Sequence, residues 1–483
     1  MRQLTSLDAQ FLNVESPTTT GHVGSLVLVD PSTAPDGRWG LETVRAVLEP
    51  RLHLAPPLRQ RLVEVPLGLG RPYWVVDPHF DIEFHLRELA LPAPGTREQL
   101  GEQIARIHAR PLDRRRPLWE GYVITGLEGG KAAYYSKIHH AAIDGISGAE
   151  ILQTIFDVTP EAREVEPEET PEPGSLPSTV GLVRRGLASA ALNPVEVLRF
   201  VPRSLSYLDE LPGAWNFPGA GLLSSTAGLV SRTLGGGHHV GHRKLHAPRT
   251  PFNGPITPHR RFAYGSVSLD DVKLVKNHFA MTVNDVVMTL AASALRRWLL
   301  DHDALPDTPL VVAVPVSVRS QDKYGEHGNE VSVMTAELPT HLADPQERLE
   351  FMRDSMHEAK RHFEAVPATI LQDLSLVLPT ALSGLAARAL FRLATVPGLL
   401  FNLFVSNVPG PQMPLYVAGA QVEGIYPASA VTDMTGGLNI TLFSYHGHLD
   451  FGLIACREMV PDVWHLIGYL QDAMAELVDL TES

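Results

Sequence analysis

The chain has 483 residues, of which 44% are hydrophobic and 19% charged, and its formal net charge is −14. This length supports a large hydrophobic core divided over two or three domains. The acidic balance argues against a protein that follows nucleic-acid phosphates and against global attraction to anionic membranes. The one cysteine, Cys456, excludes an intramolecular disulfide and a multi-cysteine zinc site. The first residues lack the apolar segment of a signal peptide, so we expect a cytoplasmic protein.

The N-terminal part of the sequence alternates helix-like and strand-like segments. Thr5 to Val14 is typical of a short capped helix, and Val23 to Val29 is apolar and β-branched. Thr96 to Ala109 has the apolar spacing of an amphipathic helix. Tyr122 to Thr125 and Ala132 to Ile138 predict paired strands, because a glycine-containing turn separates them. Between the helix and these strands, a proline-punctuated segment with three consecutive arginines is most simply read as a solvated basic turn.

The middle of the chain breaks this pattern. Glu161 to Gly174 contains six glutamates and three prolines and predicts a solvated linker. The following stretch, to about Arg249, is apolar but irregular and is expected to cross between domains. We therefore predict an N-terminal domain over residues 1–160, a linker and crossover segment over 161–250, and a C-terminal domain over 251–483.

The C-terminal part again mixes helices and strands. Thr282 to Leu300 predicts a buried helix that carries Asn284 and Asp285 in its first turn, where Asp285 can cap the helix. Leu310 to Val318 is a continuous apolar strand that ends at Arg319, a side chain that needs an anionic partner if it is buried. Further expected elements are the strands Asn329 to Leu338, Leu403 to Val408, Leu438 to Tyr445 and Leu449 to Ala455, and the helices Asp344 to Phe363 and Val463 to Leu477.

These elements predict an α+β protein with mixed sheets. Helices and strands are interleaved without a regular βαβ alternation, and neither GxGxxG after a strand nor GxxxxGK[ST] occurs. The most apolar region, Leu374 to Val405, is interrupted by arginines and prolines. Its uncharged runs are shorter than the roughly 20 residues that a membrane-spanning helix needs, so we expect buried or interfacial helices there.

The chemistry is expected where the strand over Ala132 to Ile138 runs into two adjacent histidines, His139 and His140. Histidine has an ordinary pKa near neutrality and suits general base catalysis. Neighbouring strand residues point to opposite faces, so one histidine should face the reaction and the other the protein interior. Asp144 and Gly145 follow at fixed offsets; the aspartate suits a structural ion pair and the glycine a tight turn. The alternative interpretation is a pair of half-buried histidines that bond only to the backbone.

The sequence HHAAIDG matches the HHxxxDG motif of chloramphenicol acetyltransferases, condensation domains of peptide synthetases, and bacterial wax ester synthase/diacylglycerol acyltransferases. Other segments resemble the last of these families over almost the whole chain, in the expected order. They are LTSLDAQFL (Leu4 to Leu12), GHVG (Gly21 to Gly24), RPLDRRRPLWE (Arg110 to Glu120), TVNDVVM (Thr282 to Met288), PVSVR (Pro315 to Arg319), SNVPGP (Ser406 to Pro411) and NITLFSYHGHLDFGLIA (Asn439 to Ala455).

The resemblance implies two chloramphenicol-acetyltransferase-like domains with a tunnel at their interface. It assigns His140 as the general base and places the amide of Asn284 near the reacting carbonyl. His139 is then left for local hydrogen bonding, and Gly145 provides backbone room at the site. Asp144 and Arg319 would form an architectural ion pair. In the arginine-rich segment the resemblance favours a wall beside the site, made by Pro117, Leu118 and Trp119.

The function that the resemblance implies is O-acyl transfer from long-chain acyl-CoA to diacylglycerol, and possibly to long-chain alcohols. Acyl-CoA would be a substrate, and neither a cofactor nor a metal nor a nucleic acid is expected. The protein could contact a membrane or lipid-droplet surface peripherally, because its substrates reside there. Two alternatives remain: a condensation-type enzyme that uses carrier-bound acyl groups, and a non-catalytic lipid-binding protein with the same fold.

Overall fold

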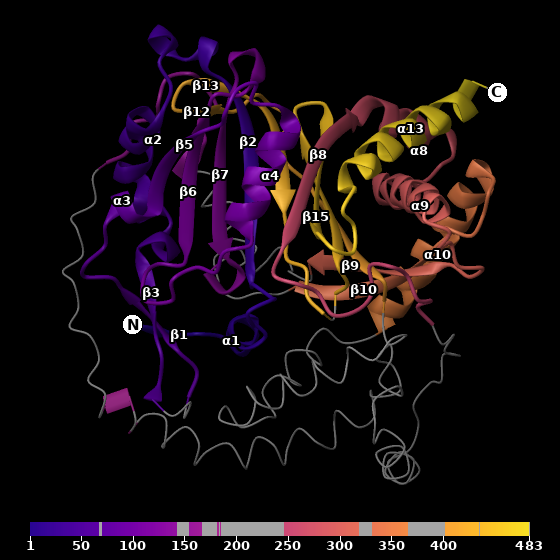
Figure 1. Cartoon of the computed structure of the whole chain (residues 1–483), viewed down its shortest axis with the longest axis horizontal. Coiled ribbons are helices and arrows are strands. Elements are labelled where there is room, and N and C mark those ends of the chain that lie inside the picture. The colour runs from indigo at the N-terminus through magenta and orange to yellow at the C-terminus, as the bar shows by residue number, and fades with distance from the viewer. Residues whose placement is uncertain are drawn as a thin grey trace.

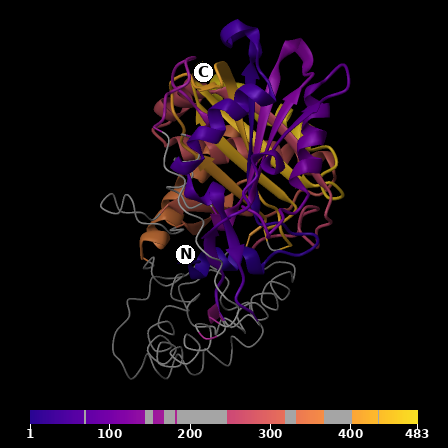
Figure 2. The same ribbon diagram turned by 90° about the vertical axis from the view of Figure 1, so that its left-hand side faces the viewer.

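A computed structural model of the chain describes residues 1–66, 70–142, 154–166, 181–182, 184, 246–317, 331–365, 401–433 and 435–482. Two domains, each built on a six-stranded sheet, lie side by side along the long axis of Figure 1. In Figure 2, which is viewed from the side of the first domain, that domain stands in front of the second. The predicted mixed-sheet α+β architecture is therefore confirmed.

The first sheet has the strand order β12-β13-β2-β7-β6-β5. Its strands are β2 (His22–Asp30), β5 (Leu86–Ala90), β6 (Trp119–Thr125), β7 (Ala132–His139), β12 (Tyr416–Val417) and β13 (Ala420–Ala428). Strands β6 and β7 form the predicted antiparallel hairpin. Only the pairing of β5 with β6 is parallel within this sheet.

The second sheet has the order β10-β9-β11-β14-β15-β8. Its strands are β8 (Arg260–Ser268), β9 (Leu310–Ser317), β10 (Val331–Leu338), β11 (Leu403–Val408), β14 (Leu438–Tyr445) and β15 (His448–Cys456). Strand β11 runs parallel to both neighbours, β9 and β14, and the other pairings are antiparallel. The two predicted strands β14 and β15 form an antiparallel hairpin, with His446 and Gly447 at its turn in left-handed backbone conformations.

The helices of the second domain cover the outer face of its sheet, whereas the first-domain helix Arg97–His108 lies between the two sheets and contacts β8 (Figure 1). In the first domain they are α1 (Ser6–Asn13), α2 (Leu41–Leu48), α3 (Ile82–His85) and α4 (Arg97–His108), and a small sheet joins β1 (Arg2–Gln3), β4 (Tyr73–Val76) and β3 (Gln60–Val63). In the second domain they are α8 (Leu269–His278), α9 (Val283–Asp301), α10 (Pro345–Ala365) and α13 (Val463–Glu482). The cap predicted at the start of α1 forms, since Thr5 accepts a hydrogen bond from the backbone N–H group of Asp8. Ser268 caps α8 in the same way by accepting from the N–H group of Asp271.

The division of the chain into domains departs from the sequence prediction at β12 and β13. These strands fall within the range 251–483 assigned to the C-terminal domain, yet β13 pairs with β2 at the edge of the first sheet. The edge of β2 presents backbone N–H and C=O groups that need a partner, and the chain supplies one from about 400 residues away. The residues next to β12 and β13 in the sequence do not indicate that these strands join the sheet of the other domain.

The exchanged strand also packs the two sheets together. A Cβ atom on Gly452 of β15 would lie 1.7 Å from the carbonyl oxygen of Pro427 in β13, so this close approach requires glycine. Beside it, Asp450 accepts hydrogen bonds from the Ile425 backbone N–H (2.8 Å) and the Ser266 hydroxyl (2.7 Å). Burial raises the pKa of the Asp450 carboxyl to about 6. The predicted tunnel at this interface stays a prediction.

Within the described part of the chain, no single helix is long and apolar enough to cross a membrane. Helices α8 and α9 reach that length and hydropathy only when taken together, and they meet at 105°. Most of the apolar region Leu374 to Val405 lies outside the described residues, as does most of the segment 161–250.

Candidate active site

The two motif histidines lie where β7 ends and one turn of 3-10 helix begins. Both are fixed through their backbones. The N–H of His139 donates to the carbonyl of Leu118 (2.9 Å), and the N–H of His140 donates to the carbonyl of Gly21 (2.8 Å). The strand end is therefore held from β6 on one side and from the start of β2 on the other.

His139 faces the protein interior and is 1% exposed. Its Nδ1 accepts a hydrogen bond from the backbone N–H of Ala141 (3.0 Å), so the ring proton of the neutral imidazole resides on Nε2. That Nε2–H points at Oε1 of Glu15, 3.1 Å away. His139 thus connects the turn that carries His140 to a carboxylate in the loop after α1.

Glu15 is the centre of this support. Its Oε1 also accepts a hydrogen bond from the backbone N–H of Gly21 (2.9 Å), and its Oε2 accepts one from Nη2 of Arg114 (2.6 Å). Burial opposes the charge on Glu15, but the bonds from His139, Gly21 and Arg114 outweigh it and lower the pKa of the carboxyl to about 2. Gly21 in turn holds the His140 backbone, so one carboxylate fixes both histidines.

His140 is half-buried, and its ring stacks on Phe11 of α1 with centroids 3.9 Å apart. Its Nδ1 is buried and makes no hydrogen bond to the described residues. Burial lowers the pKa of the His140 imidazole to about 4. The ring is therefore neutral at pH 7 and can accept a proton.

The wall residues Pro117, Leu118 and Trp119 are buried beside the histidines. The Leu118 carbonyl receives the His139 N–H, the Trp119 indole N–H donates to the carbonyl of Leu58 (2.8 Å), and His85 bonds to the carbonyl of Trp119. These contacts position the end of β6 through packing and backbone bonds.

The three consecutive arginines do three different things. Arg115 has an 89% exposed side chain and pairs with Asp113, as a solvated turn would. The Arg116 guanidinium lies over the ring of Phe84, 3.9 Å from its centroid. Arg114 instead bonds Glu15, a support that the sequence interpretation missed. No local signal reveals this pair, because the two residues are 99 positions apart.

We expect Glu15→Gln to lower the free energy of unfolding by about 1.5–3 kcal/mol, because the variant loses charge-assisted hydrogen bonds in a partly buried site. The kcat should also fall, since the turn that carries His140 is held less firmly. Urea unfolding and initial rates of thiol release measure the two effects. Glu64→Gln is the matched control: the Glu64 side chain is 67% exposed and lies 3.6 Å from the same Arg114. Equal effects of both substitutions would contradict the support assigned to Glu15.

Asn284 and Asp285 lie in the first turn of α9, in the second domain. Asp285 is buried and forms a capping box: its Oδ2 accepts the backbone N–H of Thr282 (2.8 Å), and its own N–H donates to the Thr282 hydroxyl (3.2 Å). Asn284 is exposed, and its Oδ1 accepts a hydrogen bond from Nδ2 of Asn407 (2.7 Å). The two motif residues thus differ in role, one holding the helix start and the other facing outward.

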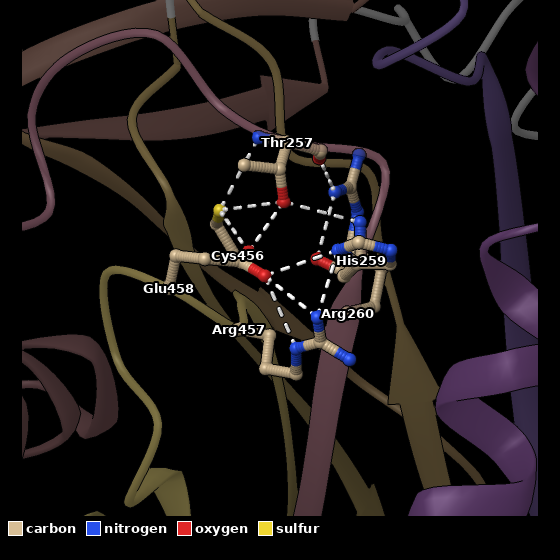
Figure 3. A network of polar contacts seen from close by, with 6 residues as sticks. All are labelled: Thr257, His259, Arg260, Cys456, Arg457 and Glu458. Atoms are coloured by element: carbon tan, nitrogen blue, oxygen red, sulfur yellow. Dashed lines mark hydrogen bonds and ion pairs between the residues drawn. The ribbon is translucent and has the colours of Figure 1, made fainter.

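Figure 3 shows a polar network where β8 begins and β15 ends. Glu458 accepts hydrogen bonds from the Thr257 hydroxyl and the Cys456 thiol and pairs with His259. Cys456 is fully buried there. The neighbouring Arg260 donates to the carbonyl of Thr18. The network thereby ties the second domain to the loop that contains Glu15.

Asp144, Gly145 and Arg319 lie outside the described residues, so the ion pair expected between Asp144 and Arg319 stays a prediction. Among the residues that are described, no group of three or more histidine, cysteine, aspartate or glutamate side chains is arranged to hold a metal ion.

Sequence comparison relates the chain, over its full length, to proteins that are named as diacylglycerol O-acyltransferases. Residues 4–287 match the wax ester synthase/diacylglycerol acyltransferase catalytic domain, and residues 327–478 match the C-terminal domain of the same family. A Mycobacterium tuberculosis protein named as a diacylglycerol O-acyltransferase is 35% identical over 484 residues, covering 100% of this chain and 91% of that protein. Another protein of that organism, similarly named, is 37% identical over 485 residues, covering 98% of this chain and 99% of its own length.

Structural comparison agrees. The wax ester synthase/diacylglycerol acyltransferase from Marinobacter aquaeolei VT8 superposes with a TM-score of 0.68 at 30% identity, with 100% of both chains covered. The starter condensation domain of rhizomide synthetase has a TM-score of 0.54 at 13% identity, covering 100% of this chain and 94% of that domain, and shares the fold. The chain therefore belongs to the wax ester synthase/diacylglycerol acyltransferase family.

Proposed function

We propose that this protein is an acyl-CoA-dependent O-acyltransferase that converts diacylglycerol to triacylglycerol and also esterifies long-chain alcohols. The observation that carries the proposal is His140, a neutral imidazole at a strand end whose backbone and neighbour are fixed by Gly21 and His139. A rigidly held neutral histidine suits proton abstraction from a weak nucleophile such as a lipid hydroxyl. Membership in the family supports the choice of acyl donor and acceptor.

In the proposed reaction, His140 accepts the proton of the acceptor hydroxyl as its oxygen attacks the thioester carbonyl. The carbonyl oxygen becomes negatively charged and accepts a hydrogen bond from the amide of Asn284. The tetrahedral intermediate then collapses to the ester and the CoA thiolate, which takes the proton back from His140. All atoms come from the two substrates, so the reaction needs no cofactor and no covalent acyl-enzyme.

We propose that the reaction takes place on the cytoplasmic side, at the surface of the inner membrane or of a lipid body. Long-chain acceptors partition into such surfaces. A net charge of −14 provides no general attraction to anionic lipid, so the contact would have to be local and apolar.

The test is thiol release from palmitoyl-CoA by the purified full-length protein, with a diacylglycerol, with a long-chain alcohol, and with neither. Release that depends on an acceptor, with formation of the matching ester, would support the proposal and rank the two acceptors. Absence of release with every acceptor would instead favour the lipid-binding alternative. A parallel assay with the palmitoyl group on a carrier tests the condensation-type alternative, which predicts release only from the carrier.

A further inference from the structure

Asn407, a residue outside the site predicted from the sequence, determines how the Asn284 amide is presented. Its Nδ2 donates a hydrogen bond to Oδ1 of Asn284 at 2.7 Å, across 123 positions of sequence. We infer that Asn407 is a positioning residue that turns the N–H₂ group of Asn284 toward the acyl carbonyl oxygen of the thioester. This inference rests on the proposed function, in which that oxygen becomes negative during the reaction.

The chemistry of the amide supports this orientation. An asparagine side chain offers one carbonyl acceptor and two N–H donors. Because Asn407 occupies the carbonyl of Asn284, the part of Asn284 left for a substrate is its nitrogen. Asn284 is exposed, so this nitrogen can reach a molecule that binds beside the start of α9. The pair thus presents a hydrogen-bond donor, which is what a developing oxyanion requires.

The opposite orientation of the two amides is less favourable. In the observed arrangement, the Oδ1 of Asn407 is buried without a partner among the described residues. Turning both amides round would bury the Asn407 N–H₂ group without an acceptor instead. Orphan N–H groups are rarer in proteins than under-satisfied carbonyl oxygens, so the arrangement that directs the Asn284 nitrogen outward is preferred.

Both asparagines are attached to rigid elements. Asn407 lies near the end of β11, where it pairs in parallel register with Leu442 of β14. The chain after it is fastened by the backbone N–H of Gly410, which donates to the Ser444 hydroxyl (3.0 Å). Asn284 follows the capped start of α9, and α9 packs against β11. A donor held on two such elements costs little reorganisation when charge develops.

The decisive variant is Asn407→Asp in the full-length protein. A carboxylate has no donor, so it accepts a hydrogen bond from the N–H₂ group of Asn284 and turns this group away from the acyl carbonyl oxygen. We expect kcat for acceptor-dependent thiol release to fall about 100-fold with KM nearly unchanged, close to the effect of Asn284→Ala. Asn407→Ala, which only frees the amide to rotate, should lower kcat by about tenfold.

A double-mutant cycle separates positioning from structural damage. If Asn407 acts through Asn284, Asn407→Asp added to Asn284→Ala causes no further loss of kcat. Gln412→Ala is the control: the Gln412 amide bonds Gly410 in the same loop and Gly447 in the turn between β14 and β15 without touching Asn284, and the variant should keep kcat within about twofold. The inference about Asn407 would be overturned, with the proposed function left standing, by additive losses of kcat in the cycle. It would also be overturned if the wild type is active and Asn407→Asp has the same kcat. A wild-type protein without acceptor-dependent release would overturn the proposed function as well.

Discussion

The His140→Ala variant is expected to release CoA from palmitoyl-CoA about 10²- to 10⁴-fold more slowly than the wild type when a lipid alcohol is present. The hydroxyl of the acceptor is a weak nucleophile, and alanine cannot accept its proton. The residual rate should no longer depend on the acceptor, because water attacks the thioester without help from the site. Initial rates with and without acceptor measure both changes.

The stability of the variant needs its own measurement, because the imidazole of His140 stacks on Phe11. Loss of this contact lowers the melting temperature but does not make a folded enzyme inactive. His357→Ala removes an exposed histidine from α10 and should leave the rate unchanged. A His140→Ala protein that is folded and retains acceptor-dependent release at the wild-type rate would refute the general base.

The part of the site that could be predicted from sequence is the part encoded locally. The strand into His139 and His140 was recognisable from its own residues, and so was the capped helix that starts at Thr282. Both depend on side chains within a few positions of each other. The alternation of strand residues also indicated that the two histidines differ, and the structure places His139 inside and His140 against Phe11.

The supports of the site could not be predicted, because each joins segments that are distant in sequence. Glu15 meets Arg114 across 99 residues, and Asn284 meets Asn407 across 123. An arginine that is exposed to solvent and an arginine that supports the site look alike in sequence, as Arg115 and Arg114 show. The exchange of β13 into the first sheet belongs to the same class, since it depends on which strand edge is left unpaired.

The folded protein is expected to lose stability steeply as the pH falls from about 6.5 to 4. Burial lowers the pKa of His108 to about 3 and that of His140 to about 4, and it also lowers those of His22 and His85. In the unfolded chain these groups titrate near 6.5. Below that pH the unfolded state binds more protons, so stability present at neutral pH is lost. At pH 5, the free energy of unfolding has fallen by about 2 kcal/mol for each of His108 and His140, relative to its value at neutral pH.

The environment of His108 shows why the neutral form is preferred. Its Nδ1 accepts a hydrogen bond from the Tyr135 hydroxyl (2.7 Å), and its Nε2–H donates one to the carbonyl of Ser429 (3.1 Å). Both ring nitrogens of the neutral imidazole therefore have a hydrogen-bond partner. Burial is the main cause of the lowered pKa, and the positive charge of the buried Lys137 adds to it. Asp450 acts in the opposite direction, because its pKa of about 6 makes folding more favourable as the pH falls. This gain offsets most of the stability that one of these histidines loses over the same pH range.

Urea unfolding between pH 7.5 and 5 measures how much the free energy of unfolding falls on acidification, and the variant His108→Gln shows how much of this fall comes from His108. Glutamine can accept from Tyr135 and donate to Ser429 but does not titrate. The variant should therefore be less stable at pH 7.5, through imperfect packing, yet lose about 2 kcal/mol less than the wild type on acidification to pH 5. His357→Gln, at an exposed position on α10, should leave the pH dependence as it is. An unfolding free energy that is constant over this range would show that the buried histidines do not stay neutral, and that conclusion would extend to His140 and its ability to accept a proton.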